Sequence, residues 1–132
     1  MAKILVIDDE EDIRNVLKTV LERAGYEVDV AANANEGLDL LRANRPDLVI
    51  TDIIMPGKDG VETVYDIRME FPNTKIIVIS GGGNVAPMEY EPSAIATTAY
   101  LASAAAAGAD ISLTKPFERD ELLNAIKGLL SE

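Results

Sequence analysis

Three aspartates stand where two apolar runs of the sequence end. Asp8 and Asp9 follow the run at residues 4–7, and Asp52 follows the run at residues 48–50. Carboxylates packed together repel one another by about 4 kcal/mol per pair at 4 Å and an effective dielectric near 20. A hard divalent cation removes this penalty, and Mg²⁺ typically takes one or two carboxylates with waters and phosphate oxygens. The spacing therefore predicts a magnesium site if the fold brings the ends of both runs together.

A hydroxyl and an amine complete the groups that phosphoryl transfer needs. Ser80 ends the apolar run at residues 75–80, and Lys115 follows the run at residues 111–114. Asp52 beside a cation would be held ionised, as a nucleophile able to form an aspartyl phosphate. Catalysis would consist of holding the donor in line and neutralising its equatorial oxygens, which Lys115, Ser80 and Mg²⁺ could share.

Each of these residues also has a purely structural explanation. Asp8 could cap a helix that follows it, and acids near a helix start interact favourably with the helix dipole. Asp52 could be a turn residue, Ser80 could end a strand before a glycine-rich turn, and Lys115 could be solvated. Only a fold that brings them together favours the chemical interpretation.

Composition narrows the classes of chemistry. The 132 residues, 48% hydrophobic and 27% charged, suit one globular domain, which we expect to span residues 1–132 without an output domain. The absence of Cys and His excludes disulfides, thiolate metal sites and imidazole-dependent mechanisms. A net charge of −11 argues against direct nucleic-acid binding. No apolar run approaches the roughly 20 residues of a membrane span, so we expect a cytoplasmic protein.

Five β-like runs alternate with helical patterns, which predicts a parallel sheet with helices on both faces. The first, third and fourth runs are continuously apolar, as central strands are, whereas the second and fifth alternate, as edge strands do. The order 2-1-3-4-5 satisfies this pattern and is the flavodoxin-like, doubly wound α/β arrangement. The five runs are residues 3–7, 27–31, 47–51, 75–80 and 111–114.

Capping residues and apolar spacing predict the helices. Asn33 followed by Glu36 resembles a capping box at the start of the second helix, and Pro46 ends it. The third helix follows Gly60, and the last begins near Arg119. The first helix has an apolar stripe closed by Gly25, which comprises Ile13, Val16, Leu17, Val20, Leu21 and Ala24.

The predicted fold brings the chemical residues to one edge. In a doubly wound sheet, ligands bind beyond the carboxyl ends of the strands, where the strand order reverses between the first and third strands. Asp8, Asp9 and Asp52 stand at that point, and Ser80 and Lys115 end the neighbouring strands. This convergence favours a phosphoryl site over five unrelated structural roles.

Four motifs at this edge resemble the receiver domain of two-component response regulators, a chemotaxis-regulator-like family. They are IDDE at 7–10, TDIIMPGKDG at 51–60, ISG at 79–81 and LTKPF at 113–117. The resemblance covers essentially the whole chain. It implies a phosphorylated signalling switch, which assists its own phosphorylation and dephosphorylation but is not otherwise an enzyme.

The resemblance also implies roles for single residues. Asp52 would accept a phosphoryl group from a phosphohistidine on a sensor kinase or phosphotransfer protein. Asp9, Asp52 and the backbone carbonyl of Ile54 would ligate Mg²⁺, and Asp8 would bind it mainly through water. The amide of Gly81 could contact the phosphoryl group. A cis bond before Pro116 would aim the preceding lysine inward.

Two features depart from the family pattern. Ser112 occupies the position, three before Lys115, where receivers normally carry a mobile aromatic. The segment between Ser80 and Lys115 is also about a dozen residues longer than is usual for the family. We expect a long loop at 81–92 and a charge-free helix at 94–107, either deeply packed or a docking surface. If it docks, this region would change its partner on phosphorylation, or form a homodimer.

Two other functions remain open on the sequence alone. A degenerate receiver would bind partners without phosphorylation. Ser112 and the lengthened loop favour this, whereas the intact acids, Ser80 and Lys115 oppose it. A haloacid-dehalogenase-like phosphotransferase also uses an aspartyl phosphate and Mg²⁺, but it needs an Asp-x-Asp pair after its first strand. This chain has Asp8-Asp9-Glu10 there instead.

Overall fold

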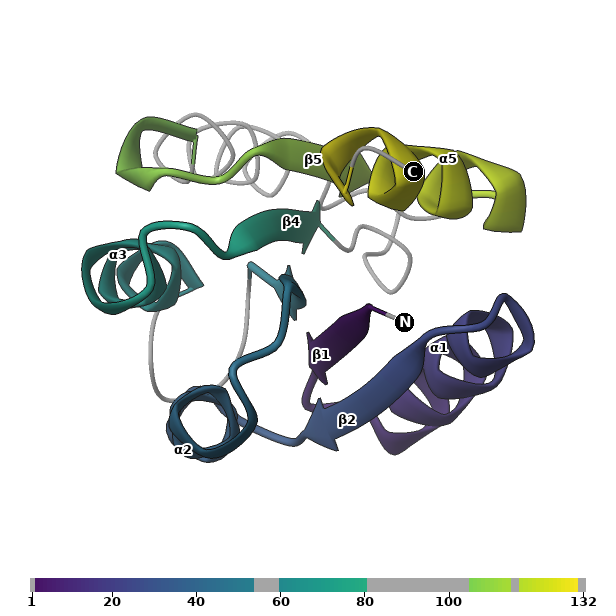
Figure 1. Ribbon diagram of the computed structural model, residues 1–132, viewed down its shortest axis with the longest axis horizontal. Helices are drawn as coiled ribbons and strands as arrows, with labels where there is room; N and C mark the ends of the chain where they lie inside the picture. The colour runs from purple at the N-terminus through teal and green to yellow at the C-terminus, as the bar shows by residue number, and fades with distance from the viewer. Residues whose placement is uncertain (1, 54–59, 81–104, 115–116, 131–132) are drawn as a thin grey trace, which may run out of the picture.

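A five-stranded parallel sheet forms the centre of the protein (Figure 1). The computed structural model describes residues 2–53, 60–80, 105–114 and 117–130. The strand order β2-β1-β3-β4-β5 confirms the flavodoxin-like, doubly wound arrangement that the sequence predicts. The strands are β1 (Lys3–Ile7), β2 (Glu27–Ala31), β3 (Leu48–Asp52), β4 (Lys75–Ser80) and β5 (Ile111–Thr114).

The third strand lies one residue later than the predicted range 47–51, and this corrects the position of Asp52. Asp52 pairs with Ile79 of β4 inside the ladder, and the next residue, Ile53, donates its backbone N–H to the Ile79 carbonyl at 2.9 Å. The ladder therefore continues past the end of the apolar run. Asp52 belongs to the strand itself and has the fixed backbone of a strand residue.

Helices cover both faces of the sheet (Figure 1). Side chains of α2 and α3 pack with Leu5 and Val49 on one face, and side chains of α1 and α5 pack with Val6 and Ile50 on the other. Successive strand residues thus enter opposite cores, which explains the uninterrupted apolar runs of β1, β3 and β4. The helices are α1 (Glu11–Arg23), α2 (Ala34–Asn44), α3 (Gly60–Glu70) and α5 (Arg119–Leu130).

Local signals set the ends of α2. The Asn33 side chain accepts a hydrogen bond from the Glu36 backbone N–H at 2.8 Å, which confirms the predicted cap. Arg45 adopts a left-handed conformation (φ 46°) and ends the helix just before Pro46. Gly37 lets α2 approach β1, because a Cβ there would collide with the Ile7 side chain.

The apolar stripe predicted for α1 is only partly buried. Leu17 and Leu21 are buried, whereas Val16 is 59% exposed and Ala24 is also exposed. The predicted stripe is wider than the contact that α1 makes with the sheet. Residues 105–107 of the predicted 94–107 helix are helical, and the helix ends before Gly108. The rest of that helix and the predicted loop at 81–92 lie outside the described residues.

Candidate functional site

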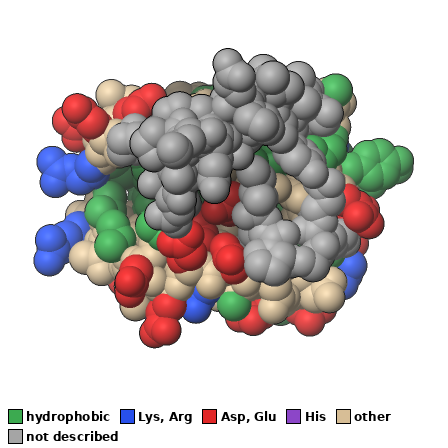
Figure 2. All heavy atoms as spheres, turned by 180° about the vertical axis from the view of Figure 1, so that it is seen from behind, with side chains coloured by type: hydrophobic (Ala, Val, Ile, Leu, Met, Phe, Trp, Pro, Cys, Tyr) green, Lys and Arg blue, Asp and Glu red, His purple; other side chains and the backbone are tan. Residues whose placement is uncertain are grey.

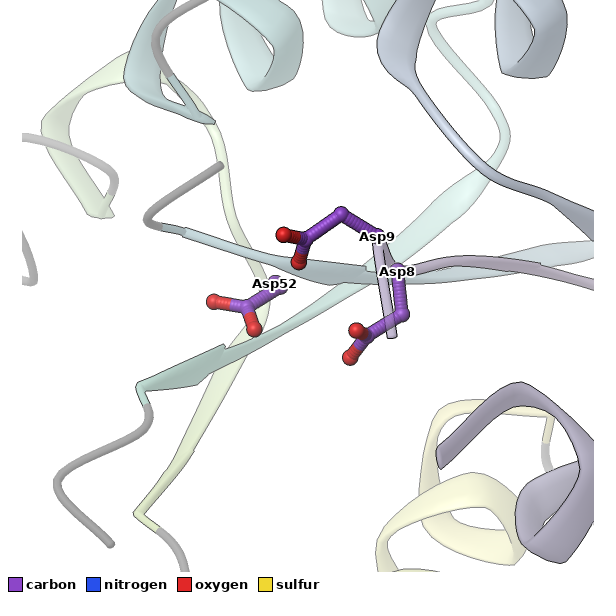
Figure 3. A group of neighbouring side chains, drawn as sticks. All are labelled: Asp8, Asp9 and Asp52. Atoms are coloured by element: carbon purple, nitrogen blue, oxygen red, sulfur yellow. The ribbon is translucent and has the colours of Figure 1, made fainter. Parts of the chain in front are cut away.

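Asp8, Asp9 and Asp52 come together at the carboxyl ends of β1 and β3 (Figure 3). One carboxylate oxygen from each lies within 4.8 Å of the others. Asp8 is 1% exposed and Asp52 6%, whereas Asp9 is exposed. The cluster therefore has a buried floor of two acids and a third acid open to solvent.

The conformation of Asp8 is held from three directions. Its backbone N–H donates to the Ala31 carbonyl of β2 at 3.1 Å, which extends the ladder beyond β1. Its carboxylate accepts the Glu10 backbone N–H at 2.9 Å, and its carbonyl accepts Nη1 of Arg14 at 2.7 Å. The turn into α1 therefore fixes the Asp8 carboxylate. Asp8 is not the helix cap that the sequence also allowed, because residue 10 is the N-cap of α1 and its side chain makes no capping hydrogen bond.

The backbone after Asp52 is held by a close approach of α3. A Cβ on Gly60, the first residue of α3, would overlap the carbonyl of Ile53. Residue 60 therefore has to be glycine for α3 to start this near the end of β3. Sequence reasoning used Gly60 only as a helix boundary, and its part beside the site was missed.

Ser80 ends β4, one position beyond the residue that pairs with Asp52. It is fully buried, and its Oγ lies 3.4 Å from Oγ1 of Thr114 in β5. Thr114 was not predicted as a site residue; its place in the LTKPF motif, immediately before Lys115, was the available signal. Ser112 is exposed, whereas the next residue, Leu113, is buried in the core between the sheet and the helices α1 and α5.

Four residues with expected roles at this edge lie outside the described residues. They are Ile54, Gly81, Lys115 and Pro116.

The acidic cluster fits a hard divalent cation. Asp8, Asp9 and Asp52 supply oxygen donors alone, which suit Mg²⁺ and disfavour metals that prefer nitrogen or sulfur. The exposed Asp9 leaves access for water and phosphate ligands. Acidic side chains are also prominent on the surface seen in Figure 2, in keeping with the net charge of −11.

An ion pair joins α2 to α3 away from this cluster. Arg42 donates through Nε and Nη2 to both carboxylate oxygens of Glu70, at 2.7 and 2.9 Å. These hydrogen bonds lower the pKa of Glu70 and raise that of Arg42. Because both side chains are exposed, solvent screens the attraction between them.

A family model described as the response regulator receiver domain matches residues 4–127. The chain belongs to this family. This confirms the expected family. None of the helices described here is long and apolar enough to cross a membrane.

Three curated relatives of this receiver domain differ in length. Response regulator MprA of Mycolicibacterium vanbaalenii is 34% identical over 97% of this chain, which spans about half the length of that relative. Sporulation initiation phosphotransferase F of Bacillus subtilis is 32% identical, with 97% of this chain and 93% of the relative covered. Chemotaxis protein CheY of Halobacterium salinarum is 33% identical over 99% of both chains.

Solved structures agree with this membership. A CheY-like receiver domain protein from Methanospirillum hungatei superposes with a TM-score of 0.83 at 30% identity, covering 99% of this chain and 94% of that one. A receiver domain protein from Clostridium thermocellum gives a TM-score of 0.82 at 34% identity, with 99% and 95% covered. The fold and the order of elements are therefore those of solved receiver domains.

Proposed function

We propose that this receiver domain is a Mg²⁺-dependent phosphoacceptor that takes its phosphoryl group on Asp52. The observation that carries the proposal is the meeting of three carboxylates within 4.8 Å. The buried Ser80 ends β4, the strand next to β3. Such a cluster is explained better by phosphoryl transfer than by a role in core packing, because like charges destabilise a fold unless a cation binds between them. The name of the Bacillus relative, a phosphotransferase, supports the same chemistry.

Asp52 would act as the nucleophile. One carboxylate oxygen attacks phosphorus, and a new P–O bond forms as the P–N bond to the donor's imidazole breaks. The imidazole leaves with the electron pair, and the product is a mixed anhydride on Asp52. The strand backbone holds the carboxylate for in-line attack, which is the main contribution a protein can make to this reaction.

The other residues would neutralise and orient the phosphoryl oxygens. Ser80 would donate its hydroxyl to one oxygen, and Lys115 and the Gly81 amide would serve the others. Asp8 and Asp9, with Asp52 and the Ile54 carbonyl, would hold Mg²⁺. The cation would supply charge neutralisation between the acids and the incoming phosphoryl group.

Signalling partners follow from this chemistry. The donor would be a sensor histidine kinase or a phosphotransfer protein that carries a phosphohistidine. Phosphorylation would then alter residues 81–107, which would bind a downstream protein or a second copy of this chain. Hydrogen exchange with and without beryllofluoride tests this step. Changes that spare residues 81–107 would refute it.

Intact mass after incubation with acetyl phosphate tests the proposal. The wild-type chain should gain one phosphoryl group with Mg²⁺ and none with excess EDTA. Asp52→Asn should gain none under either condition. Asp120→Asn, which removes an exposed acid of α5, is the matched control and should label like wild type. Equal labelling with and without EDTA would contradict the proposal. Steady turnover of phosphomonoesters would favour the haloacid-dehalogenase-like alternative.

A further inference from the structure

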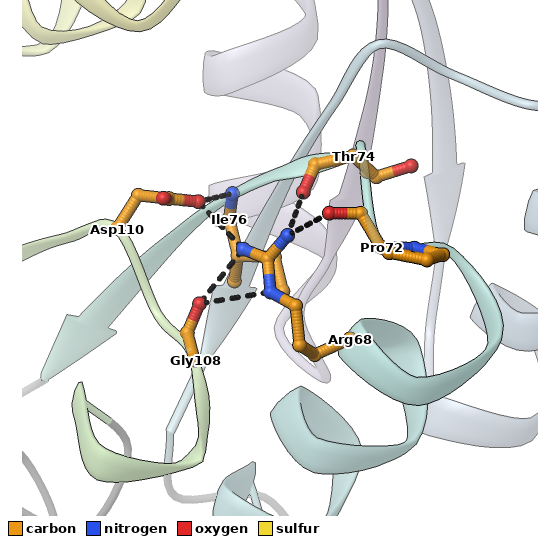
Figure 4. Close-up of polar contacts among 6 residues, drawn as sticks. All are labelled: Arg68, Pro72, Thr74, Ile76, Gly108 and Asp110. Atoms are coloured by element: carbon orange, nitrogen blue, oxygen red, sulfur yellow. Dashed lines mark hydrogen bonds and ion pairs between the residues drawn. The ribbon is translucent and has the colours of Figure 1, made fainter.

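The guanidinium of Arg68, near the end of α3, uses all five of its N–H donors (Figure 4). Nε and Nη2 donate to the Gly108 carbonyl at 3.2 and 2.7 Å, and Nη2 also donates to the Asp110 carboxylate at 2.8 Å. Nη1 donates to the carbonyls of Pro72 and Thr74 at 2.7 and 2.9 Å. One side chain thus joins the α3–β4 turn to the chain that enters β5.

Asp110 adds a second connection at the same point. The Asp110 carboxylate oxygen that binds Arg68 also accepts the Ile76 backbone N–H at 2.8 Å. The Asp110 backbone N–H donates to the Ile76 carbonyl at 2.9 Å. Both backbone groups of Ile76 are therefore held by one residue, which fixes how the start of β5 aligns with β4.

Gly108 permits this arrangement. Its backbone has a φ of +125°, which residues other than glycine rarely adopt. A Cβ at this position would lie 2.9 Å from Cγ of Arg68. The close approach lets two N–H groups of Arg68 reach one carbonyl.

The alignment matters because β5 is a short edge strand. It has four residues, and among the described strands it pairs with β4 alone. A slip of one residue would turn each side chain of β5 to the opposite face of the sheet. From the anchored pair at Ile76, the ladder runs through Ile77 and Ile111 to Ser80 and Thr114 at the proposed phosphoryl site. An anchor at one end of the strand pair thus sets which residue meets Ser80 at the other.

We infer that Arg68 and Asp110 are positioning residues for the β4–β5 half of the phosphoryl site. The inference rests on the proposed function and deepens it. The half that would hold Mg²⁺ lies on β1 and β3, whose ladder includes neither residue. The two halves therefore separate in an experiment: disturbing the anchor should slow phosphoryl transfer and leave the affinity for Mg²⁺ unchanged.

Two conservative variants test this separation in the full chain. Arg68→Lys keeps the charge and loses the planar set of donors, and Asp110→Asn keeps an acceptor for Ile76 and loses the ion pair. With acetyl phosphate at saturating Mg²⁺, each should label roughly ten- to a hundredfold more slowly, as small displacements of reacting groups do. Mg²⁺ affinity by calorimetry should match wild type. Arg42→Lys, which weakens an exposed pair between α2 and α3, is the matched control and should label normally.

Three outcomes would overturn the inference. Folded variants that label at the wild-type rate would show that the anchor does not position the site. Parallel losses of Mg²⁺ affinity and labelling would show general damage, and so would loss of folding in both variants. Failure of the proposed function looks different, because the wild-type chain would then acquire no Mg²⁺-dependent label.

Discussion

At the scale of single residues, the acidic cluster combines burial with like charge. Asp8 and Asp52 are almost fully buried, and each has a carboxylate oxygen within 4.8 Å of the other. Burial removes hydration from both carboxylates, and the two charges also repel each other. Both effects destabilise the fold unless positive charges compensate them. The cluster is therefore where function and stability should oppose each other most clearly.

Neutralising one acid should stabilise the protein in the absence of Mg²⁺. Asp8→Asn keeps an oxygen to accept the Glu10 N–H and removes one charge. We expect the free energy of unfolding to rise by about 1–3 kcal/mol, part of the repulsion available at this distance. Urea denaturation in EDTA measures the change, and Mg²⁺ titration of the same variant should show weaker binding.

Asp39→Asn is the matched control for that experiment. This aspartate of α2 has a side chain that is 80% exposed, so its removal should change stability little. Equal stabilisation of both variants would show that the gain in stability comes from the lower net charge of the molecule and not from the acidic cluster.

The sequence identified the acids and Ser80 because each stands at or just beyond the end of an apolar run, and the carboxyl ends of parallel strands share one edge. It did not identify the contact between Ser80 and Thr114, or those of Arg68 with Gly108 and Asp110. Those contacts join residues 34 to 42 positions apart and depend on the register between strands. Composition and periodicity do not encode register at an edge strand.

At the scale of elements, α2 shows how far local signals reach. Its cap was predictable because Asn33 and Glu36 lie within one turn of each other. Its approach to β1 through Gly37 was not, since that contact needs the packed sheet. The one-residue shift of β3 has the same origin, because Asp52 joins the strand through its partner on β4.

Removing the cap of α2 should destabilise the fold. Asn33→Ala deletes the acceptor of the Glu36 N–H, and we expect a loss of about 1 kcal/mol. Asn33→Asp, which restores an acceptor, should recover most of it. Thermal unfolding followed by circular dichroism measures both variants, and an alanine variant as stable as wild type would contradict this role.

The Arg42–Glu70 pair should stabilise the α2–α3 contact in a pH-dependent way. Its hydrogen bonds lower the pKa of Glu70 in the folded state. A lowered carboxyl pKa contributes stability above the pKa of the unfolded chain, and the contribution is lost as the pH falls through the folded value. The stability difference between wild type and Glu70→Gln should therefore shrink in acid, below the usual range of a glutamate.

Salt provides the check on that pair. Both partners are exposed, so added salt at neutral pH should reduce the same difference. A difference that is independent of both pH and salt would show that Glu70 contributes through packing and not through charge.

At the scale of the whole molecule, Mg²⁺ should raise the melting temperature. A cation that binds the folded chain alone stabilises it by about 2.7 kcal/mol at a hundred times its Kd. Because the net charge is −11, any salt will reduce general repulsion, so sodium chloride at matched ionic strength is the necessary comparison. Asp9→Asn should lose the part of the shift that is specific to Mg²⁺. Equal shifts with both salts would count against a built cation site.

The proposed function depends most on which residue carries the phosphoryl group. Borohydride reduction of the labelled chain converts an aspartyl phosphate to homoserine, and peptide mass spectrometry then locates the modified residue. We predict modification at Asp52 alone, in Mg²⁺-treated samples only. Modification at Asp8 or Asp9, or at any residue in EDTA, would contradict it.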